Sequence, residues 1–251
     1  MSEKRLLNDF DVLLKRHKRL DRYQDDNIAD SDKPENLVLK NQTTKPPKQD
    51  AFAKLMSISR SSRVQTLVSN VPGLSIKMDV IQDGNSLIRQ LQSLPGWKPV
   101  GSAEHSRRVL HFGRAYNYSA KAASRLTTAT PLPEILEPLR KIAEDVSGRI
   151  LDQCLINQYL PGQGIGEHID KTDAFGDTVV CFSLGSTAVL VFRHPDGRKV
   201  NLDVPPHSMY VMTGESRYVW SHEMPARMKD GIRTRGTRLS ITFRNVKDQY
   251  K

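Results

Sequence analysis

The chain has 251 residues and a formal net charge of +10, from 38 Lys and Arg against 28 Asp and Glu. Its two cysteines, Cys154 and Cys181, are too few for a disulfide framework and lie in predicted strands, which indicates a reducing compartment. No apolar run approaches the length of a membrane span, and the N-terminus lacks a signal peptide's apolar stretch. We therefore expect a monomer of the nucleus or cytoplasm, with nucleic acid as the first candidate for an acidic partner.

Residues 1–70 are expected to form a mostly disordered basic arm with short helices. Apolar residues recur at helical spacing over 6–14 and are followed by the basic run 15–19. This helix could pack on the domain, or its cationic end could serve RNA contact or nuclear import. Residues 25–50 are polar and poor in aromatics, which is typical of a linker. Residues 50–60 carry a short apolar face that could dock on a protein partner or begin the folded domain.

Between residues 71 and 146 the pattern mixes helices with strands. Apolar residues at helical spacing predict helices over 86–94 and 132–146. Between them, residues 107–118 interleave arginines with aromatic residues, a combination that can contact phosphates and stack on bases. A strand with half-buried aromatic residues is the alternative interpretation of this segment.

From residue 150 onward, short β-rich runs are separated by turns rich in Gly, Pro and Asp. Such even spacing predicts a mainly β fold, a jelly-roll or related barrel with flanking helices. Strands are expected over 154–160, 178–184, 188–192, 199–204, 208–213, 218–222 and 239–244. In the first strand, Asn157 and Tyr159 share a face, so an amide and a phenol could hydrogen-bond a carboxylated ligand.

A candidate metal site comes from His168 and Asp170, with a second histidine at His222. Residues two apart on a strand point to the same side, so His168 and Asp170 could converge on one ion. Two imidazoles and one carboxylate leave open positions on a metal, which suits non-haem iron(II) oxygenases. The same donors also bind zinc. A surface pair or a buried structural histidine is the alternative for the H-x-D motif alone.

The run Arg238 to Arg244 alternates polar and apolar residues and predicts a half-buried strand. Arg238, Ser240 and Arg244 share one face of it. If that face lines a barrel, the two guanidinium groups need anionic partners, because an unpaired buried charge is costly. A dicarboxylate would satisfy both, and a zinc hydrolase needs no such clamp. An edge strand with solvent-facing arginines is the alternative.

Together these motifs resemble the AlkB family of iron(II)- and 2-oxoglutarate-dependent dioxygenases, whose signature runs N-x-Y, H-x-D, a distal His, then R-x-(N/S)-x-x-x-R. The resemblance covers residues 71–247, with 248–251 as a tail. It is closest to the AlkB domain of the tRNA wobble-uridine hydroxylase branch, which the runs 156–165, 211–218 and 235–238 are similar to. The resemblance implies a double-stranded β-helix core with a nucleotide-recognition lid.

The resemblance also implies roles for the residues quoted above. His168, Asp170 and His222 would hold Fe(II) as the catalytic centre. For 2-oxoglutarate, Arg238 beside Tyr159 would pair with the distal carboxylate, and Arg244 with Asn157 would meet the chelating end. Ser240 stands where many members have asparagine. With O2, decarboxylation of the cosubstrate would yield succinate, CO2 and an oxidised substrate. The lid residues expected to contact substrate are Arg107, Arg108, His111, Phe112 and Tyr116.

The expected function is therefore oxidation of a base in DNA or RNA. In animals, the tRNA hydroxylase branch joins its oxygenase to an RNA-recognition domain and a methyltransferase, which do not fit in 251 residues. We accordingly expect oxidative dealkylation of N-alkylated bases first, with hydroxylation of a modified wobble uridine in tRNA as the alternative. A paired base would have to be flipped from the stack. An oxygenase of a protein such as a histone, or a non-catalytic binding module, is the alternative of another class.

Overall fold

The computed structural model describes residues 66–247, apart from 69, 101–105, 117–125 and 129. Most of the predicted basic arm, including the segment 50–60, lies outside the described residues, as does the tail 248–251.

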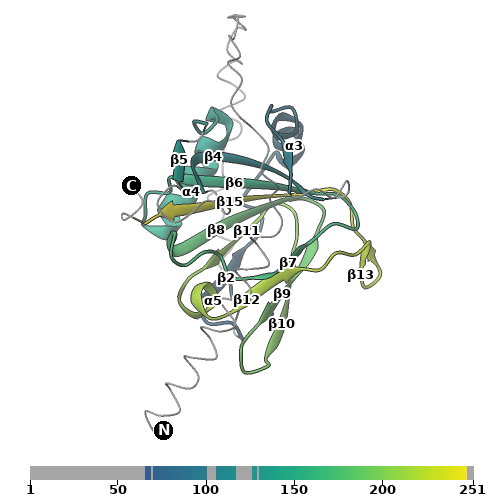
Figure 1. Ribbon diagram of the computed structural model, residues 1–251. Coiled ribbons are helices and arrows are strands. Elements are labelled where there is room, and N and C mark those ends of the chain that lie inside the picture. Colours follow the sequence, from purple (N-terminus) through teal and green to yellow (C-terminus); the bar gives the residue numbers. More distant parts are fainter. Residues whose placement is uncertain (1–65, 69, 101–105, 117–125, 129, 248–251) are drawn as a thin grey trace, which may run out of the picture.

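Two antiparallel sheets form the body of the molecule (Figure 1). The large sheet runs in the order β1 (Thr66–Leu67), β2 (Leu74–Lys77), β11 (Ser208–Met212), β8 (Phe175–Gly185), β15 (Arg238–Val246), β6 (Gln153–Tyr159), β4 (Arg108–Tyr116) and β3 (Lys98–Pro99), with β5 (Leu126–Thr128) paired to β4. The small sheet runs β10 (Lys199–Val204), β9 (Ala188–Arg193), β12 (Ser221–Met224) and β7 (Ile165–His168). A separate hairpin pairs β13 (Lys229–Asp230) with β14 (Arg233–Thr234).

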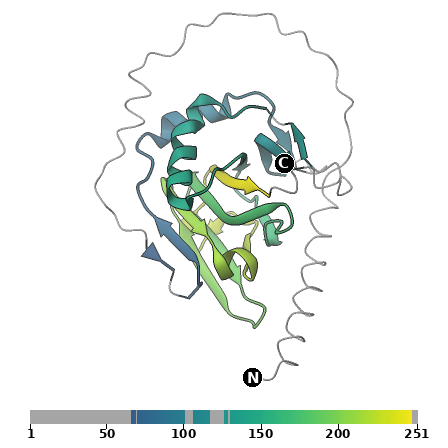
Figure 2. The ribbon, with the colours of Figure 1, turned by 90° about the vertical axis from the view of Figure 1, so that its left-hand side faces the viewer.

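The large sheet lies between the small sheet and a layer of helices (Figure 2). Its central strands β8, β15 and β6 are buried on both faces, so alternate residues enter two different cores. On one face, Ile156 and Phe243 pack with Leu87 of α3 (Gly84–Gln92) and Leu139 of α4 (Glu137–Ser147). On the other face, Tyr159 and Cys181 join Phe192 and Trp220 from the small-sheet side. This two-sheet arrangement confirms the predicted mainly β, jelly-roll fold.

The helices begin and end where local chemistry dictates. Asp83 caps α3, because its Oδ1 accepts the backbone N–H of Ser86 at 3.0 Å. The 3₁₀ turn η2 (Glu134–Leu136) leads into α4, which has Pro138 in its first turn and ends at Gly148 with φ of 63°. Both predicted helices are thus confirmed. None of the described helices has the length and apolarity to cross a membrane.

One predicted strand, 218–222, is partly wrong. Thr213 and Ser216 form a capping box that starts the short helix α5 (Gly214–Tyr218), and the strand β12 begins only at Ser221. Trp220, within the predicted strand, lies between α5 and β12 and is fully buried in the core. Cys154 and Cys181 are buried free thiols in β6 and β8, as the sequence predicted.

Candidate metal centre and cosubstrate pocket

Three side chains predicted as metal ligands meet at the end of the small sheet. His168 is the last residue of β7 and pairs directly with His222 of β12 across the ladder. Asp170 follows two residues later, and the ligand atoms of all three lie within 4.8 Å of one another. The expectation that His168 and Asp170 share a strand is wrong, because β7 ends at His168. The triad forms from a strand pair and the turn that follows it.

The turn that carries Asp170 is held by Arg217 of α5, which is only 1% exposed. Its guanidinium donates to the backbone carbonyls of Asp170 at 2.8 Å, Gly176 at 3.0 Å and Lys171 at 3.2 Å. The chain bends around this buried group instead of continuing the strand, which explains the departure from the predicted geometry. Sequence reasoning assigned Arg217 no role, because an arginine is normally expected at the surface. Its place in the run 211–218 was the one signal.

The electrostatics of the triad give two neutral imidazoles and one ionised carboxylate. His168 Nδ1–H donates to the Gly166 carbonyl at 2.8 Å, which leaves Nε2 as its ligand atom. Burial lowers the pKa of His168, and burial with His168 beside it lowers the pKa of His222 to about 3. Burial alone would raise the pKa of Asp170, but Arg244 and His222 outweigh it and hold this pKa well below its usual range. These are the protonation states that a metal ion requires.

Two arginines line the interior face of β15, a central strand between β8 and β6. Arg238 and Arg244 are 3% and 2% exposed, so the prediction of buried arginines is confirmed and the solvent-facing edge strand is excluded. The register places Arg238 opposite Tyr159 and Ser240 opposite Asn157 on β6. The motifs that the sequence separates by some eighty residues are therefore cross-strand neighbours.

A model of the 2OG-Fe(II) oxygenase superfamily matches residues 82–244, a span that contains the triad and both buried arginines. The chain belongs to this superfamily. The predicted enzyme class, a 2-oxoglutarate-dependent dioxygenase, follows from that membership and is confirmed.

Relatives of this 2OG-Fe(II) oxygenase carry AlkB-type names, which confirms the resemblance drawn from the sequence. The mouse and macaque proteins named tRNA (carboxymethyluridine(34)-5-O)-methyltransferase ALKBH8 are 35% and 40% identical over 209 and 205 residues. Each match covers 70% of this chain but only 31% of the relative, so the chain spans about a third of their length. An Arabidopsis relative, named alkylated DNA repair protein ALKBH8 homolog, is 27% identical. The match covers 71% of this chain and 60% of the relative.

The fold also matches solved structures. The structure of OsALKBH1 superimposes with a TM-score of 0.53 at 20% identity, covering 69% of this chain and 98% of that one. At this identity the likeness shows the oxygenase fold alone.

The residues of the site fit the iron and 2-oxoglutarate that the superfamily implies. His222 Nδ1 is buried without a hydrogen-bond partner among the described residues, and so is Nη2 of Arg238. The recorded partners of the Arg238 guanidinium are neutral, Ser183 Oγ at 3.1 Å and Met224 Sδ at 3.9 Å. A buried guanidinium with an unsatisfied donor fits a carboxylate ligand. Burial raises the pKa of Tyr159, which keeps the phenol beside Arg238 neutral and able to donate a hydrogen bond.

The triad would hold the iron, and Arg238 with Tyr159 would hold the distal carboxylate of the cosubstrate. When both are bound, they supply the oxidation of a substrate C–H bond by O2, while the protein positions and shields the reacting groups. Ser240 lies on the same face beside Tyr159, and its hydroxyl partly offsets the rise in the pKa of the phenol. The roles of these residues toward the cosubstrate stay predictions.

Arg244 and Asn157 already have protein partners in the structure. Arg244 Nη1 lies 3.3 Å from Asp170 Oδ1, and its Nε donates to Gln153 Oε1 at 2.9 Å. Asn157 Oδ1 accepts from Arg107 Nε at 3.0 Å. Their expected contact with the chelating end of 2-oxoglutarate stays a prediction, and the structure adds that Arg244 stabilises the metal-ligand carboxylate.

The predicted substrate residues on and beside β4 separate onto two faces. Arg107 lies at Asn157 near the site, and His111 points to the same side, where burial and then Arg244 lower its pKa to about 4. Phe112 points the other way and is 5% exposed in the core under the helices, so its assignment as a substrate contact is wrong. Strand alternation separates the two neighbours, and the helix layer buries the face that carries Phe112.

The other two predicted substrate residues are less informative. Arg108 is exposed, and its guanidinium lies 5.4 Å from the centroid of the Trp97 ring. The side chain of Tyr116 lies outside the described part of the chain.

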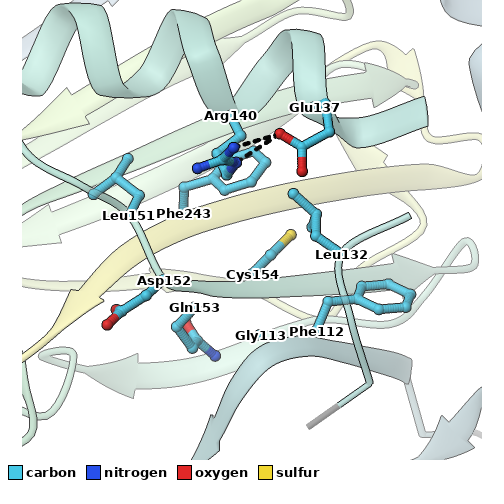
Figure 3. Close-up of a pocket in the computed structure, with 10 residues that line it drawn as sticks. All are labelled: Phe112, Gly113, Leu132, Glu137, Arg140, Leu151, Asp152, Gln153, Cys154 and Phe243. Carbon is cyan, nitrogen blue, oxygen red and sulfur yellow. Dashed lines mark hydrogen bonds and ion pairs between the residues drawn. The ribbon is translucent and has the colours of Figure 1, made fainter. Parts of the chain in front are cut away.

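A separate pocket lies beneath α4, on the helix side of the large sheet (Figure 3). Phe112, Phe243 and Cys154 supply much of its wall, and Glu137 of α4 pairs with Arg140 at 2.6 Å at its edge. These apolar side chains belong to the core under the helices, whereas Tyr159 belongs to the core between the sheets. The pocket is therefore distinct from the metal centre, and its lining residues bring together no set of metal ligands.

Proposed function

We propose that this oxygenase acts on nucleic acid and hydroxylates a modified wobble uridine in tRNA. The observation that carries the proposal is the set of relatives whose names refer to carboxymethyluridine at position 34 of tRNA, at 33–40% identity over 70% of this chain. The methyltransferase activity in those names belongs to proteins about three times as long as the matched segment and forms no part of this proposal. The identity of these relatives outweighs the argument from chain length and reverses the expected order of substrates.

The local electrostatics support a nucleic-acid substrate. Arg107 lies at Asn157 near the predicted cosubstrate residues, Arg108 is exposed at the start of β4, and the net charge is +10. A polyanion is attracted to such a surface, whereas a basic histone tail is repelled. His111, kept neutral by burial, has an Nδ1 without a hydrogen-bond partner among the described residues. A neutral imidazole there can hydrogen-bond the edge of a base.

Oxidative dealkylation of N-alkylated bases is the second candidate. It is favoured by the name of the Arabidopsis relative, alkylated DNA repair protein ALKBH8 homolog. Both reactions need the same metal and cosubstrate and hydroxylate a C–H bond of a base. On an N-alkyl group the hydroxylated carbon breaks from nitrogen and leaves as an aldehyde, whereas a hydroxyl group on a carbon-bound substituent of uridine is retained.

Mass spectrometry of nucleosides separates the two candidates. The 251-residue chain with Fe(II), ascorbate and 2-oxoglutarate is incubated with tRNA carrying modified wobble uridines and with N-alkylated oligonucleotides. A new hydroxylated uridine, with succinate in equal amount, is expected from the wild type and is absent from His168→Ala. The matched control is His194→Ala, which removes a histidine from the turn between β9 and β10.

Each other outcome contradicts part of the proposal. Loss of the alkyl group from an oligonucleotide, with tRNA unchanged, would assign dealkylation instead. Succinate formed with a peptide and with neither nucleic acid would assign a protein substrate. Full turnover by His168→Ala would overturn the triad.

A further inference from the structure

The hairpin β13–β14 connects the strand of the metal ligand His222 to the strand of Arg238. It closes with a two-residue loop, since Asp230 pairs with Arg233 on either side of Gly231 and Ile232. Gly231 has φ of 61° and Ile232 a negative φ, the combination of a type II′ turn with glycine at its first loop position. This turn places the Ile232 side chain at the tip, where it is 99% exposed.

The base of the hairpin is fixed by a buried ion-pair cluster. Asp230 is 6% exposed and accepts from Arg235 Nε at 2.7 Å and Nη2 at 2.8 Å, and from Arg227 Nε at 2.6 Å. The backbone N–H of Val189 in β9 also donates to it at 3.2 Å. Burial would raise the pKa of Asp230, but the hydrogen bonds from Arg235 and Arg227 lower it, so the carboxylate stays ionised. A bidentate pair of this kind orients the backbone on either side.

This cluster leaves the outer surface of the hairpin cationic. Residues 225–237 contain four basic residues and one acid, and that acid, Asp230, is buried in the cluster. Arg227, Lys229 and Arg233 remain exposed. Arg233 pairs with Asp203, but both side chains are about half exposed, and such pairs exchange partners at little cost.

The hairpin is next to the turn that follows Tyr159. Among the described residues, seven large hydrophobic side chains are exposed, and three of them lie in these two neighbouring segments: Leu160, Met228 and Ile232. Met228 Sδ lies 3.2 Å from where a Cβ on Gly162 would be, and Gly164 packs against the backbone of Met224 and Ala226. The same turn contacts the segment that leads into β4, because Gln163 Nε2 donates to the Ser106 carbonyl at 3.0 Å.

We propose that the β13–β14 hairpin and the turn 160–164 form a nucleic-acid-binding surface beside the metal centre and Arg238. In this arrangement, Lys229 and Arg233 contact phosphates, and Ile232 with Met228 packs on an unstacked base. The inference rests on the proposed function and names the part of the surface that binds the substrate. Charge selects the occupant: cations around an exposed apolar tip suit a single-stranded segment or loop of RNA, whose phosphates and splayed bases offer both contacts.

Two hairpin variants and two matched controls test this surface. Binding of a fluorescein-labelled RNA stem–loop to the full chain is measured by anisotropy over a range of salt concentrations. Lys229→Glu is expected to weaken binding about tenfold and to reduce the slope of log K against log salt by roughly one or more. Ile232→Ser is expected to weaken binding roughly tenfold at an unchanged salt slope, because it removes an apolar contact.

The controls replace the same residue types away from the hairpin. Ile150→Ser removes an apolar side chain that is 75% exposed after α4, and Lys199→Glu reverses an exposed charge at the start of β10. Both are expected to bind RNA as the wild type does.

The outcomes distinguish this inference from the proposed function. If the wild type binds and oxidises RNA and the hairpin variants do so equally well, the surface is elsewhere and the proposed function stands. If the wild type neither binds nor oxidises nucleic acid, both are overturned. Equal weakening in hairpin and control variants would also overturn the inference, because overall charge would then explain the binding.

Discussion

Arg244 and Arg238 lie on one face of β15, six residues apart, and both are buried, yet their surroundings differ. The protein itself neutralises Arg244, through Asp170, and holds it with Gln153 and the Phe175 ring, whose centroid lies 4.1 Å from the guanidinium carbon. In the described part of the chain, the recorded partners of Arg238 are a hydroxyl, a thioether and an aromatic ring, and none of them is acidic. Arg244 is thus paired within the fold, whereas Arg238 has no recorded acidic partner among the described residues, so we expect a ligand carboxylate to pair with Arg238.

The largest effect is expected when the neutralised arginine is removed. Arg244→Met leaves Asp170 without its nearest cation, and breaking a buried pair by removing one partner costs about 3–5 kcal/mol. Urea unfolding of the metal-free protein should show this loss of stability. The control Arg198→Met removes an exposed pair with Asp196 and should change stability by less than about 1 kcal/mol. A loss from Arg244→Met no larger than in this control would mean that the Asp170 pair contributes nothing.

Binding of a divalent metal ion to the triad should increase the free energy of unfolding. A divalent ion that binds only the folded state raises the unfolding free energy by about 2.7 kcal/mol at one hundred times its dissociation constant. Thermal unfolding with Fe(II) without oxygen, or with Mn(II), should therefore shift upward in the wild type, and a chelator should reverse it. His222→Ala should abolish the shift. A shift that persists in this variant would place the metal outside the triad.

A smaller effect is expected at Arg217. The variant Arg217→Lys keeps the charge but loses the planar fork that reaches several carbonyls. The expected loss of stability in urea unfolding is about 2 kcal/mol, the scale of a buried hydrogen bond to a charged group. Because the turn carries Asp170, metal affinity measured by titration should fall as well. Unchanged metal affinity would mean that Arg217 supports the fold without positioning the ligand.

The matched control for this variant is Arg149→Lys. Arg149 forms an exposed pair with Asp177, so the same substitution there should change the unfolding free energy by less than about 1 kcal/mol. Metal affinity should stay as in the wild type. An equal loss in both variants would mean that the fork of Arg217 has no special part in holding the turn.

Sequence reasoning identified the residues of the site better than their geometry. Short sequence motifs were sufficient to predict the site residues. The H-x-D motif gave His168 and Asp170, and the alternation of polar and apolar residues gave Arg238 and Arg244. The turn at Asp170 depends on Arg217, which is distant in the chain and points inward against the usual preference of its residue type. No local pattern contains that contact.

The same limit explains the error at β4. Alternation correctly separates His111 from Phe112, but both faces of this strand are covered, so alternation alone cannot say which face meets the site and which meets the helices. The hairpin 229–234 was missed for a different reason, because its strands are two residues long and carry charge instead of β-branched side chains. Its position depends on the buried partner of Asp230, which the sequence does not mark.

The smallest effect on stability, and the sharpest test of the comparison, is expected at Arg238. Arg238 is a buried charge with no recorded acidic partner among the described residues. An apolar side chain of similar volume at such a position is neutral or stabilising. Arg238→Met should therefore change the unfolding free energy by less than about 1 kcal/mol. The same variant should lose the stabilisation that 2-oxoglutarate gives the metal-loaded wild type, because the carboxylate partner is gone. Urea unfolding without ligand and thermal shifts with 2-oxoglutarate measure the two effects separately. A large loss of stability without ligand would show that Arg238, like Arg244, is held by the protein, and the contrast between the two arginines would fail.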